Sequence, residues 1–451
     1  MNTFKIHTIK VLISVILSSF LFLSAYSEEG KKWSLSDCVE YGLNHSLSLK
    51  ISENNSEKEK MNYRQTQWQL APSLNGGAYG NMNFNRSTDQ NNQISSGNTY
   101  YLNYGLSASL DIFKGLSRIN QISAMKFNSL AFSQEVEQQK NLLYLNIVKH
   151  FSESVYYKQQ VAIAEEQLQL SMKEQERIES KVELGLLENS AEEEIKATVS
   201  GNRYSLEKQR NSYRSSLLSL TQLIELPDTT GFDLSATEFN LLVPSEKDYT
   251  SGKVYQQACD NLPNLKEKEY RLRYYKKLRS AYEGQILPSI SLSGNYDSYF
   301  YSTDTLSNGK TTPLQTQYNN YLNPSIGVSV NIPIFNKRST DFQIRKSKID
   351  IDNAILDLEQ QKKEIFNEIQ NAIQLFNASY YEYVNASDNL KFVEKSFGIY
   401  REKYSLGLIN STDFITAQNQ LLQSKNNVLE AKFNWIYQEK LIRLYCGYKE
   451  F

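Results

Sequence analysis

The chain has 451 residues and a formal net charge of −1, which excludes a surface that recruits nucleic acid or an anionic membrane by charge alone. Hydrophobic residues make up 40% of the chain, a share typical of folded protein rather than of disordered protein. Only 19 glycines and 8 prolines are spread over this length, which favours long helices. We therefore expect a folded, helix-rich chain that binds no nucleic acid.

Residues 1–27 have the composition of a secretory signal peptide. Lys5 and Lys10 precede an apolar run over residues 11–23, and small residues follow that run. The run is shorter than the ~20 residues that a spanning helix requires, so a retained anchor is the less favoured alternative. No later segment is apolar for long enough to span as a helix. We expect an exported protein, and strands would have to form any membrane-spanning part of it.

The three cysteines, Cys38, Cys259 and Cys446, are odd in number and far apart, so they predict no disulfide framework. Cys38 follows Asp37, which is a poor residue before a lipid-attachment cysteine, and it fits a helical pattern. We expect Cys38 to be buried, with lipid attachment as the alternative. The three histidines are scattered, and no arrangement typical of a metal site, a cofactor site or a catalytic centre stands out.

Internal repetition is the most informative feature of the sequence. Pro288 lies 216 positions after Pro72, whereas Gly327 and Gly407 lie 222 positions after Gly105 and Gly185. One insertion of six residues reconciles the two offsets. The sequence therefore predicts two repeats with a linker between them, at residues 28–226, 253–451 and 227–252.

Each repeat predicts the same order of elements. An amphipathic helix ends before a proline, two strands follow, and a very long helix then turns at a glycine into a return helix. The first helix is expected at 35–69 and 253–285, and the long helix at 116–184 and 338–406. Gly185 and Gly407 are expected to be left-handed caps. Ser190 and Thr412 are expected to be N-caps of the return helices, and Ser190 with Glu193 matches a capping box.

The strands, expected at 73–84, 101–112, 288–300 and 322–334, alternate apolar with small polar residues. Each has about the length of a strand that crosses a bilayer, so we predict a barrel wall with lipid outside and water inside. A soluble sheet with one solvated face is the alternative. Four strands cannot close a barrel, so a symmetric oligomer has to complete it. The polar loops 85–99 and 302–318 would be extracellular. In the third strand, apolar residues face one way: Ile290, Leu292, Gly294 and Tyr296.

Several short segments resemble the TolC-like outer-membrane efflux proteins along nearly the whole mature length. The matching segments are 70–74 and 286–290 at the strand entrances, 111–115 and 332–336 at the strand exits, and 403–407 at the second turn. The resemblance implies an α+β protomer that gives four strands to a twelve-stranded trimeric β-barrel, continued by an antiparallel helical coiled-coil barrel. It also implies an outer-membrane channel with its helical part in the periplasm, working with a periplasmic adaptor and an inner-membrane pump.

By resemblance, the two helical turns would contact the adaptor, through Lys181, Leu184, Gly185, Leu186, Lys403, Tyr404, Leu406, Gly407 and Leu408. Asp413 and Thr416 would line the pore constriction, although Thr416 stands where the family has a second aspartate. Ile409 and Ala191 replace the expected arginine and aspartate of the closing lock, and Glu192 to Glu194 are an alternative source of acidity. The function hypothesis is an exit duct for drugs, metal ions or secreted polypeptides, and the alternative is a non-conducting periplasmic coiled-coil scaffold.

Overall fold

The computed structural model describes residues 32–88, 94–235, 239, 242–304, 306 and 309–448. The expected signal peptide, residues 1–27, lies outside these ranges. The chain divides into two compact units. We call residues 48–139 with 255–368 the sheet unit, and residues 1–47, 140–254 and 369–451 the helical unit.

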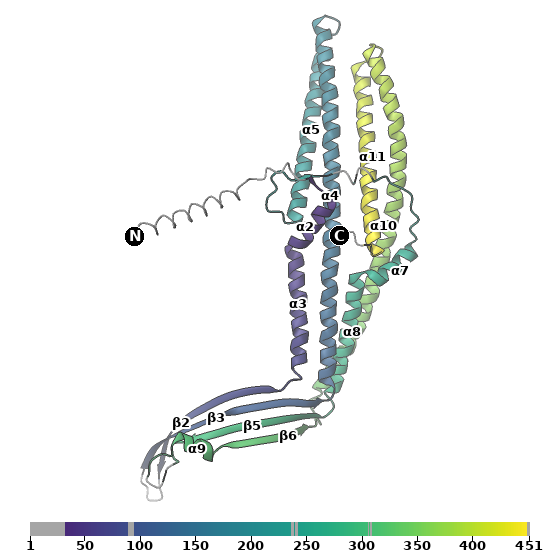
Figure 1. Cartoon of the computed structure of the whole chain (residues 1–451). Helices are drawn as coiled ribbons and strands as arrows, with labels where there is room; N and C mark the ends of the chain where they lie inside the picture. The colour runs from purple at the N-terminus through teal and green to yellow at the C-terminus, as the bar shows by residue number, and fades with distance from the viewer. Residues whose placement is uncertain are drawn as a thin grey trace, which may run out of the picture. The chain divides into compact units, whose positions relative to one another are not determined.

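The sheet unit contains one antiparallel sheet with the strand order β2-β3-β5-β6 (Figure 1). The strands are β2 (Ser73–Thr88), β3 (Ile94–Lys114), β5 (Ser289–Tyr301) and β6 (Asn323–Asn331). The first two strands run on into residues expected to be loop, and a short helix, α9 (Leu314–Asn320), begins in the second expected loop and extends two residues past it. Strands β2 and β6 are the edges of this open sheet.

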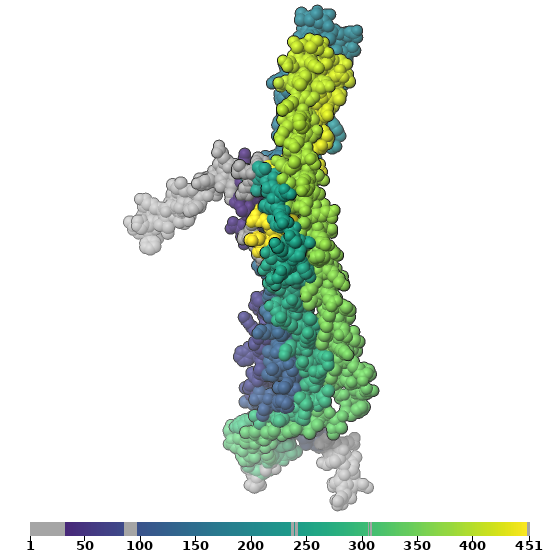
Figure 2. All heavy atoms as spheres, turned by 90° about the vertical axis from the view of Figure 1, so that its right-hand side faces the viewer, coloured from purple at the N-terminus to yellow at the C-terminus, as the bar shows by residue number. Residues whose placement is uncertain are grey.

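Helices α3 (Leu47–Trp68) and α8 (Pro263–Gly284) and the first halves of two long helices complete the sheet unit. The long helices are α4 (Ser117–Glu183) and α10 (Ser339–Ser405). The Nδ2 of Asn128 in α4 donates to Glu59 of α3 at 2.7 Å. Figures 1 and 2 both show α8 beside the first half of α10. Long-range polar contacts therefore fasten neighbouring helices of this unit.

Each first helix, expected to be continuous, is broken in the structure. Leu35–His45 (α2) ends at Ser46, whose ψ of 120° leaves the helical region, and α3 begins at Leu47. In the second repeat, α7 (Ser251–Asn261) ends before Leu262, which is extended because Pro263 follows it. Pro263 then stands at the start of α8, where its missing N–H costs nothing.

Two glycines meet where β3 leads into α4 in the sheet unit. Gly115 has a φ of +60°, and a Cβ on it would lie 1.9 Å from the carbonyl oxygen of Gly284. A Cβ on Gly284 would in turn lie 2.4 Å from the carbonyl oxygen of Gly115. The end of α8 and the start of α4 can approach this closely only because neither residue has a side chain.

The helical unit contains α2, α5 (Asn189–Leu223), α11 (Ser411–Tyr445) and the second halves of α4 and α10. A short parallel pair joins β1 (Lys32–Trp33) to β4 (Asp233–Leu234). The core of the unit is aromatic: Phe239 packs against Phe151 at 5.3 Å and against Phe433 at 5.9 Å between ring centroids. Phe239 belongs to the segment between the repeats, so this segment packs on the helices of the unit.

Lys158 of α4 anchors the same segment through charge. Its Nζ lies 2.6 Å from Oδ1 of Asp233 and also donates to the carbonyl oxygen of Leu234. The hydroxyl of Tyr213 in α5 donates to Asp233 at 2.7 Å. The lysine and the tyrosine hold the pKa of the Asp233 carboxyl below its usual range, against the opposing effect of partial burial.

Cys38 lies inside α2 and is fully buried. Burial, with a smaller contribution from Asp37, raises the pKa of its thiol to about 12. Its place in a packed helix, behind a capping box at Ser34, agrees with the expectation of buried packing rather than lipid attachment. Among the described residues, no helix is long and apolar enough to cross a membrane.

Candidate functional site

Both long helices end in the same turn. Gly185 and Gly407 have φ of +71° and +73°, so both are left-handed caps as expected. Leu186 donates its N–H to the Lys181 carbonyl at 2.8 Å, and Leu408 donates to the Lys403 carbonyl at 2.9 Å. In each of these bonds the N–H lies five residues after the carbonyl, which is the pattern of a Schellman motif. Lys181 and Lys403 thus contribute backbone carbonyls to the turns.

Four leucines project from these two turns. They are between 68% and 73% exposed, far more than leucine side chains in a helix-packing stripe. Each turn therefore presents two apolar side chains beside a lysine, a surface suited to contact with another protein. The four are Leu184, Leu186, Leu406 and Leu408.

The expected N-caps of the return helices are wrong. Helix α5 has Glu188 at its N-cap with no side-chain cap bond, and Ser190 already lies inside the helix. Helix α11 has Asn410 at its N-cap, and the Asn410 side chain accepts from the Asp413 N–H at 2.8 Å. Both helices start two residues earlier than the sequence suggested, because the glycine turn needs only a few residues to reverse the chain.

Asp413 and Thr416, the two residues expected to line the constriction, are exposed and lie in the first two turns of α11. The hydroxyl of Thr416 donates to the Thr412 carbonyl at 2.8 Å, so it is used within its own helix. Ile409, which stands where the family has an arginine, packs instead against an apolar cluster with Phe397, Phe414 and Ala417 as its core. Asp413 therefore has no basic partner at position 409 in this chain.

Sequence reasoning missed a cluster that joins the two hairpins of the helical unit, formed by Glu174, Arg177 and Tyr404. The Arg177 guanidinium binds Glu174 through Nε and Nη2, at 3.1 and 2.8 Å. It also lies 4.5 Å from the centroid of the Tyr404 ring. Burial and the neighbouring Glu174 raise the pKa of Tyr404 to about 12. We call these three residues the tip clasp.

A second link between the hairpins uses Glu194 of α5. Its carboxylate accepts from the Ser411 hydroxyl at 2.9 Å and from the Thr412 hydroxyl at 3.4 Å. Glu192 and Glu193, the other two acidic candidates, pair with Lys196 in the same helix. Of the three glutamates, only Glu194 reaches the other hairpin.

Two apolar clusters near the tips each lie within one hairpin. One cluster of α4 and α5 consists of Ala164, Leu168, Val199 and Leu206. The cluster around Phe414 belongs to α10 and α11, and the Tyr404 ring stacks on Phe414 at 4.5 Å. Polar and cationic side chains link the two hairpins near the tips, as with Lys425 and Glu166 at 2.8 Å and Arg177 on Tyr404. Farther from the tips, the rings of Tyr156 in α4 and Phe433 in α11 lie 6.0 Å apart between centroids.

The sheet has one apolar face and one polar face, as the alternation predicted. Residues directly opposite across an antiparallel pair share a face, and Leu74, Ala108, Gly294 and Ile326 form one such row. Ile326 is 85% exposed in the protomer, and Val328 and Val330 beside it are also exposed. An exposed apolar face of this extent needs a partner or lipid to cover it.

One residue departs from the expected alternation. The register between β3 and β5 shifts between Asp111 and Phe113, so that Phe113 pairs with Ile290 and Ile112 is the extra residue of a β-bulge. Phe113, rather than Ile112, therefore continues the apolar face. The position of a bulge cannot be predicted from the alternation of apolar and polar residues in one strand, because it depends on the register with the partner strand.

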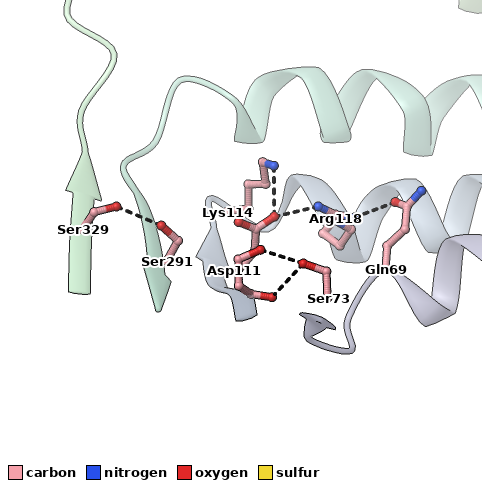
Figure 3. A network of polar contacts seen from close by, with 8 residues as sticks. Gln69, Ser73, Asp111, Lys114, Arg118, Ser291 and Ser329 are labelled. Carbon is pink, nitrogen blue, oxygen red and sulfur yellow. Dashed lines mark hydrogen bonds and ion pairs between the residues drawn. The ribbon is translucent and has the colours of Figure 1, made fainter. Parts of the chain in front are cut away.

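The polar face carries serine pairs and a charged network next to the helices (Figure 3). Figure 3 shows Arg118 at the start of α4 reaching Asp111 of β3 and Gln69, at 2.8 and 2.6 Å. Lys114 also binds Asp111 at 3.1 Å. The Ser73–Ser109 and Ser291–Ser329 hydroxyls pair at 2.8 and 2.9 Å. The polar face thus ends at the helices in a network centred on Asp111.

An open four-stranded sheet with one exposed apolar face, in a chain with two long helical hairpins, defines the protomer of an outer-membrane channel. The model of the family described as "Outer membrane efflux protein" matches residues 42–225 and 254–447, once for each repeat. The chain belongs to this family, and it is an outer-membrane protein whose helical part lies in the periplasm. The family consists of channels rather than enzymes.

The chain is similar to Toxin and drug export protein A of Aggregatibacter actinomycetemcomitans, at 22% identity over 79% of this chain and 75% of the relative. Its fold is similar to that of CusC, with a TM-score of 0.77 at 18% identity over 94% of this chain and 96% of CusC. The Campylobacter jejuni CmeC outer membrane channel gives 0.76 at 18% identity over 92% and 85%. Members of the family work as trimers with an adaptor and an inner-membrane pump.

Proposed function

We propose that three copies of this chain, after removal of residues 1–27, form a twelve-stranded barrel that is the exit duct of a tripartite pump. The exposed apolar face of the sheet is the observation that carries the proposal. Burial of Ile326, Val328 and Val330 against lipid accounts for their exposure in the protomer. Pairing of β6 with β2 of the next copy satisfies both open edges, since unpaired edges do not persist in lipid.

The polar face then lines a water-filled route, and solutes pass along it without a chemical step. The name of the relative Toxin and drug export protein A supports drugs or toxins as the cargo. Metal ions and secreted polypeptides are the other cargo classes that we proposed from the family resemblance. Identification of the inner-membrane pump that co-purifies with the native complex would distinguish these classes.

The two glycine turns are the proposed contact with the adaptor. The exposed leucine pairs beside Lys181 and Lys403 support this role, because they offer apolar area and positive charge on a rigid turn. Leu184 and Leu406 are the residues to change first, since both are strongly exposed and each directly precedes the glycine of its turn.

Conductance in planar bilayers tests the proposal. The purified protein should insert as an oligomer, conduct discrete currents, and migrate differently on gels before and after heating. The non-conducting scaffold alternative predicts instead that the protein washes off membranes in alkaline carbonate and gives no currents. A membrane-bound protein without currents would contradict the duct while leaving the outer-membrane location intact.

Asp413 is the proposed constriction residue. A ring of three carboxylates favours cations and binds multivalent ones, so Asp413→Ala should raise single-channel conductance about twofold and weaken block by trivalent cations. Asp388→Ala is the control, because Asp388 is an exposed carboxylate paired with Lys391 on α10. Unchanged conductance and block in Asp413→Ala would remove Asp413 from the constriction.

A further inference from the structure

The polar face of the sheet contains a shallow hollow of about 460 Å³. Its floor is bare backbone, because Gly77 and Gly105 are paired across β2 and β3. A Cβ on Gly105 would lie 2.6 Å from the carbonyl oxygen of Tyr296, so the close approach of β3 and β5 requires glycine there. A Cβ on Gly77 would meet nothing within 4 Å. The floor can therefore receive a flat group against the backbone at Gly77, whereas the Asp297 side chain borders the floor at Gly105.

Tyrosines stand along one side of this floor. The adjacent row of the sheet is Tyr79, Asn103 and Tyr299, one residue from each of three strands. The two tyrosines are separated by two strand spacings, about 10 Å, with Asn103 between them. Tyr299 also stacks with Tyr101 at 5.9 Å between centroids. The hollow therefore offers aromatic faces and edges to a planar ligand.

A carboxylate without a basic partner stands at the opposite end of the glycine row. Asp297 is paired with Gly105 and lines the hollow. Within the part of the chain that the structure describes, Asp297 forms no ion pair, whereas Asp111 on the same face is bound by Lys114 and Arg118. The Tyr299 side chain hydrogen-bonds to Asp297 and so helps to orient the carboxylate. The charge of Asp297 is available to a ligand.

We propose that this hollow binds organic monocations that carry a planar aromatic ring. The ring lies on the open backbone at Gly77, beside the row that contains Tyr79, and the cationic group lies against Asp297. Tyrosine faces attract quaternary ammonium groups, and a carboxylate adds Coulomb attraction. The inference rests on the proposed function, which places the polar face on the water-filled side of the barrel and repeats the hollow three times.

Block of single-channel current by phenyltrimethylammonium tests the inference. Wild-type channels should show concentration-dependent block, and Asp297→Asn should raise the half-blocking concentration about tenfold, because the ligand loses its only anionic partner in the hollow. Gly77→Val should have a similar effect, since its side chain fills the floor without a clash. Gly80→Val is the matched control: Gly80 lies on the same strand but on the opposite face. Equal half-blocking concentrations in all four proteins would overturn the inference.

Two comparison ligands separate the ring from the charge. Tetramethylammonium keeps the charge and benzamide keeps the ring, and each should block at least fivefold more weakly than phenyltrimethylammonium. Equal block by tetramethylammonium would overturn the aromatic part of the inference. Saturation-transfer NMR of phenyltrimethylammonium with nanodisc-embedded protein gives a readout that needs no current. Binding that is lost in Asp297→Asn but retained in Gly80→Val supports the inference even if the protein conducts no current. Currents without binding of phenyltrimethylammonium overturn the inference and leave the proposed channel function intact.

Discussion

Gly115 shows how strongly a single backbone position constrains this fold. Its φ of +60° disfavours any side chain, and the carbonyl of Gly284 occupies the place of its Cβ. Gly115→Ala should therefore lower the free energy of unfolding by about 1–3 kcal/mol or more, measured as a lower midpoint of thermal unfolding in detergent.

Gly201 supplies the control for that change. It lies within α5, and a Cβ added there would meet nothing within 4 Å, so Gly201→Ala should stabilise the helix by about 0.5–1 kcal/mol. Equal thermal midpoints for the two alanine variants would contradict the view that the junction of α4 and α8 depends on glycine.

Cys38 should be chemically inert in the folded protein. With a pKa of about 12, its thiol stays protonated at pH 8, and burial shields it from reagents. Because this pKa is raised above the ordinary value of 9.0, burial of the neutral thiol contributes fully to the free energy of unfolding below pH 9. This contribution is lost as the pH rises toward 12. Maleimide labelling at pH 8 should modify Cys38 only after denaturation. Rapid labelling of the native protein would contradict the buried position.

The role of a residue could be predicted from the sequence where the signal for it lies in neighbouring residues. Gly185 and Gly407 were predictable as caps, because a glycine at the end of a helical pattern identifies itself in the sequence. The tip clasp was not, because Glu174 and Arg177 form an ordinary pair three residues apart on one helix. Only the folded chain brings the Tyr404 ring to Arg177.

At the level of elements, the two faces of the sheet give a sharp test. Ile326→Lys places a charge on the apolar face. Near the middle of the bilayer, such a charge should lower the stability of the folded barrel by about 2–4 kcal/mol. Ser325→Lys, at the neighbouring residue on the polar face, should be tolerated. The heat-stable oligomer and the outer-membrane fraction on gels are the measurements. Similar losses in both variants would contradict the assignment of the faces.

The strand pairs and the long helices were predictable because their signals extend over many residues. The period of two continues through four strands, and α4 and α10 contain no proline. The breaks at Ser46 and Leu262, the bulge at Ile112 and helix α9 were not predicted. The break at Leu262 does have a signal in the sequence, Pro263, whereas the break at Ser46 depends on one backbone torsion and the bulge on a partner strand.

For the molecule as a whole, the polar links between the hairpins near their tips bear on how the channel closes. Glu174→Gln combined with Glu194→Gln removes the charge from both links and should raise single-channel conductance more than either change alone, because the two links act in parallel.

Glu165→Gln is the matched control for the double variant. Its carboxylate pairs with Arg210, which lies in the same hairpin, so its loss should leave conductance unchanged. A double variant that conducts like the wild type would show that these links stabilise the fold without restraining the pore.

The open sheet also has a consequence for the kinetics of assembly. A newly exported protomer carries two unpaired strand edges and an apolar surface that it cannot bury alone. In the proposed trimer neither defect is repaired until copies meet, so we expect the slow step of maturation to be a collision between chains rather than a rearrangement within one chain. The rate of maturation then rises with the concentration of protomers, and low expression prolongs the interval in which each edge is open to the wrong partner.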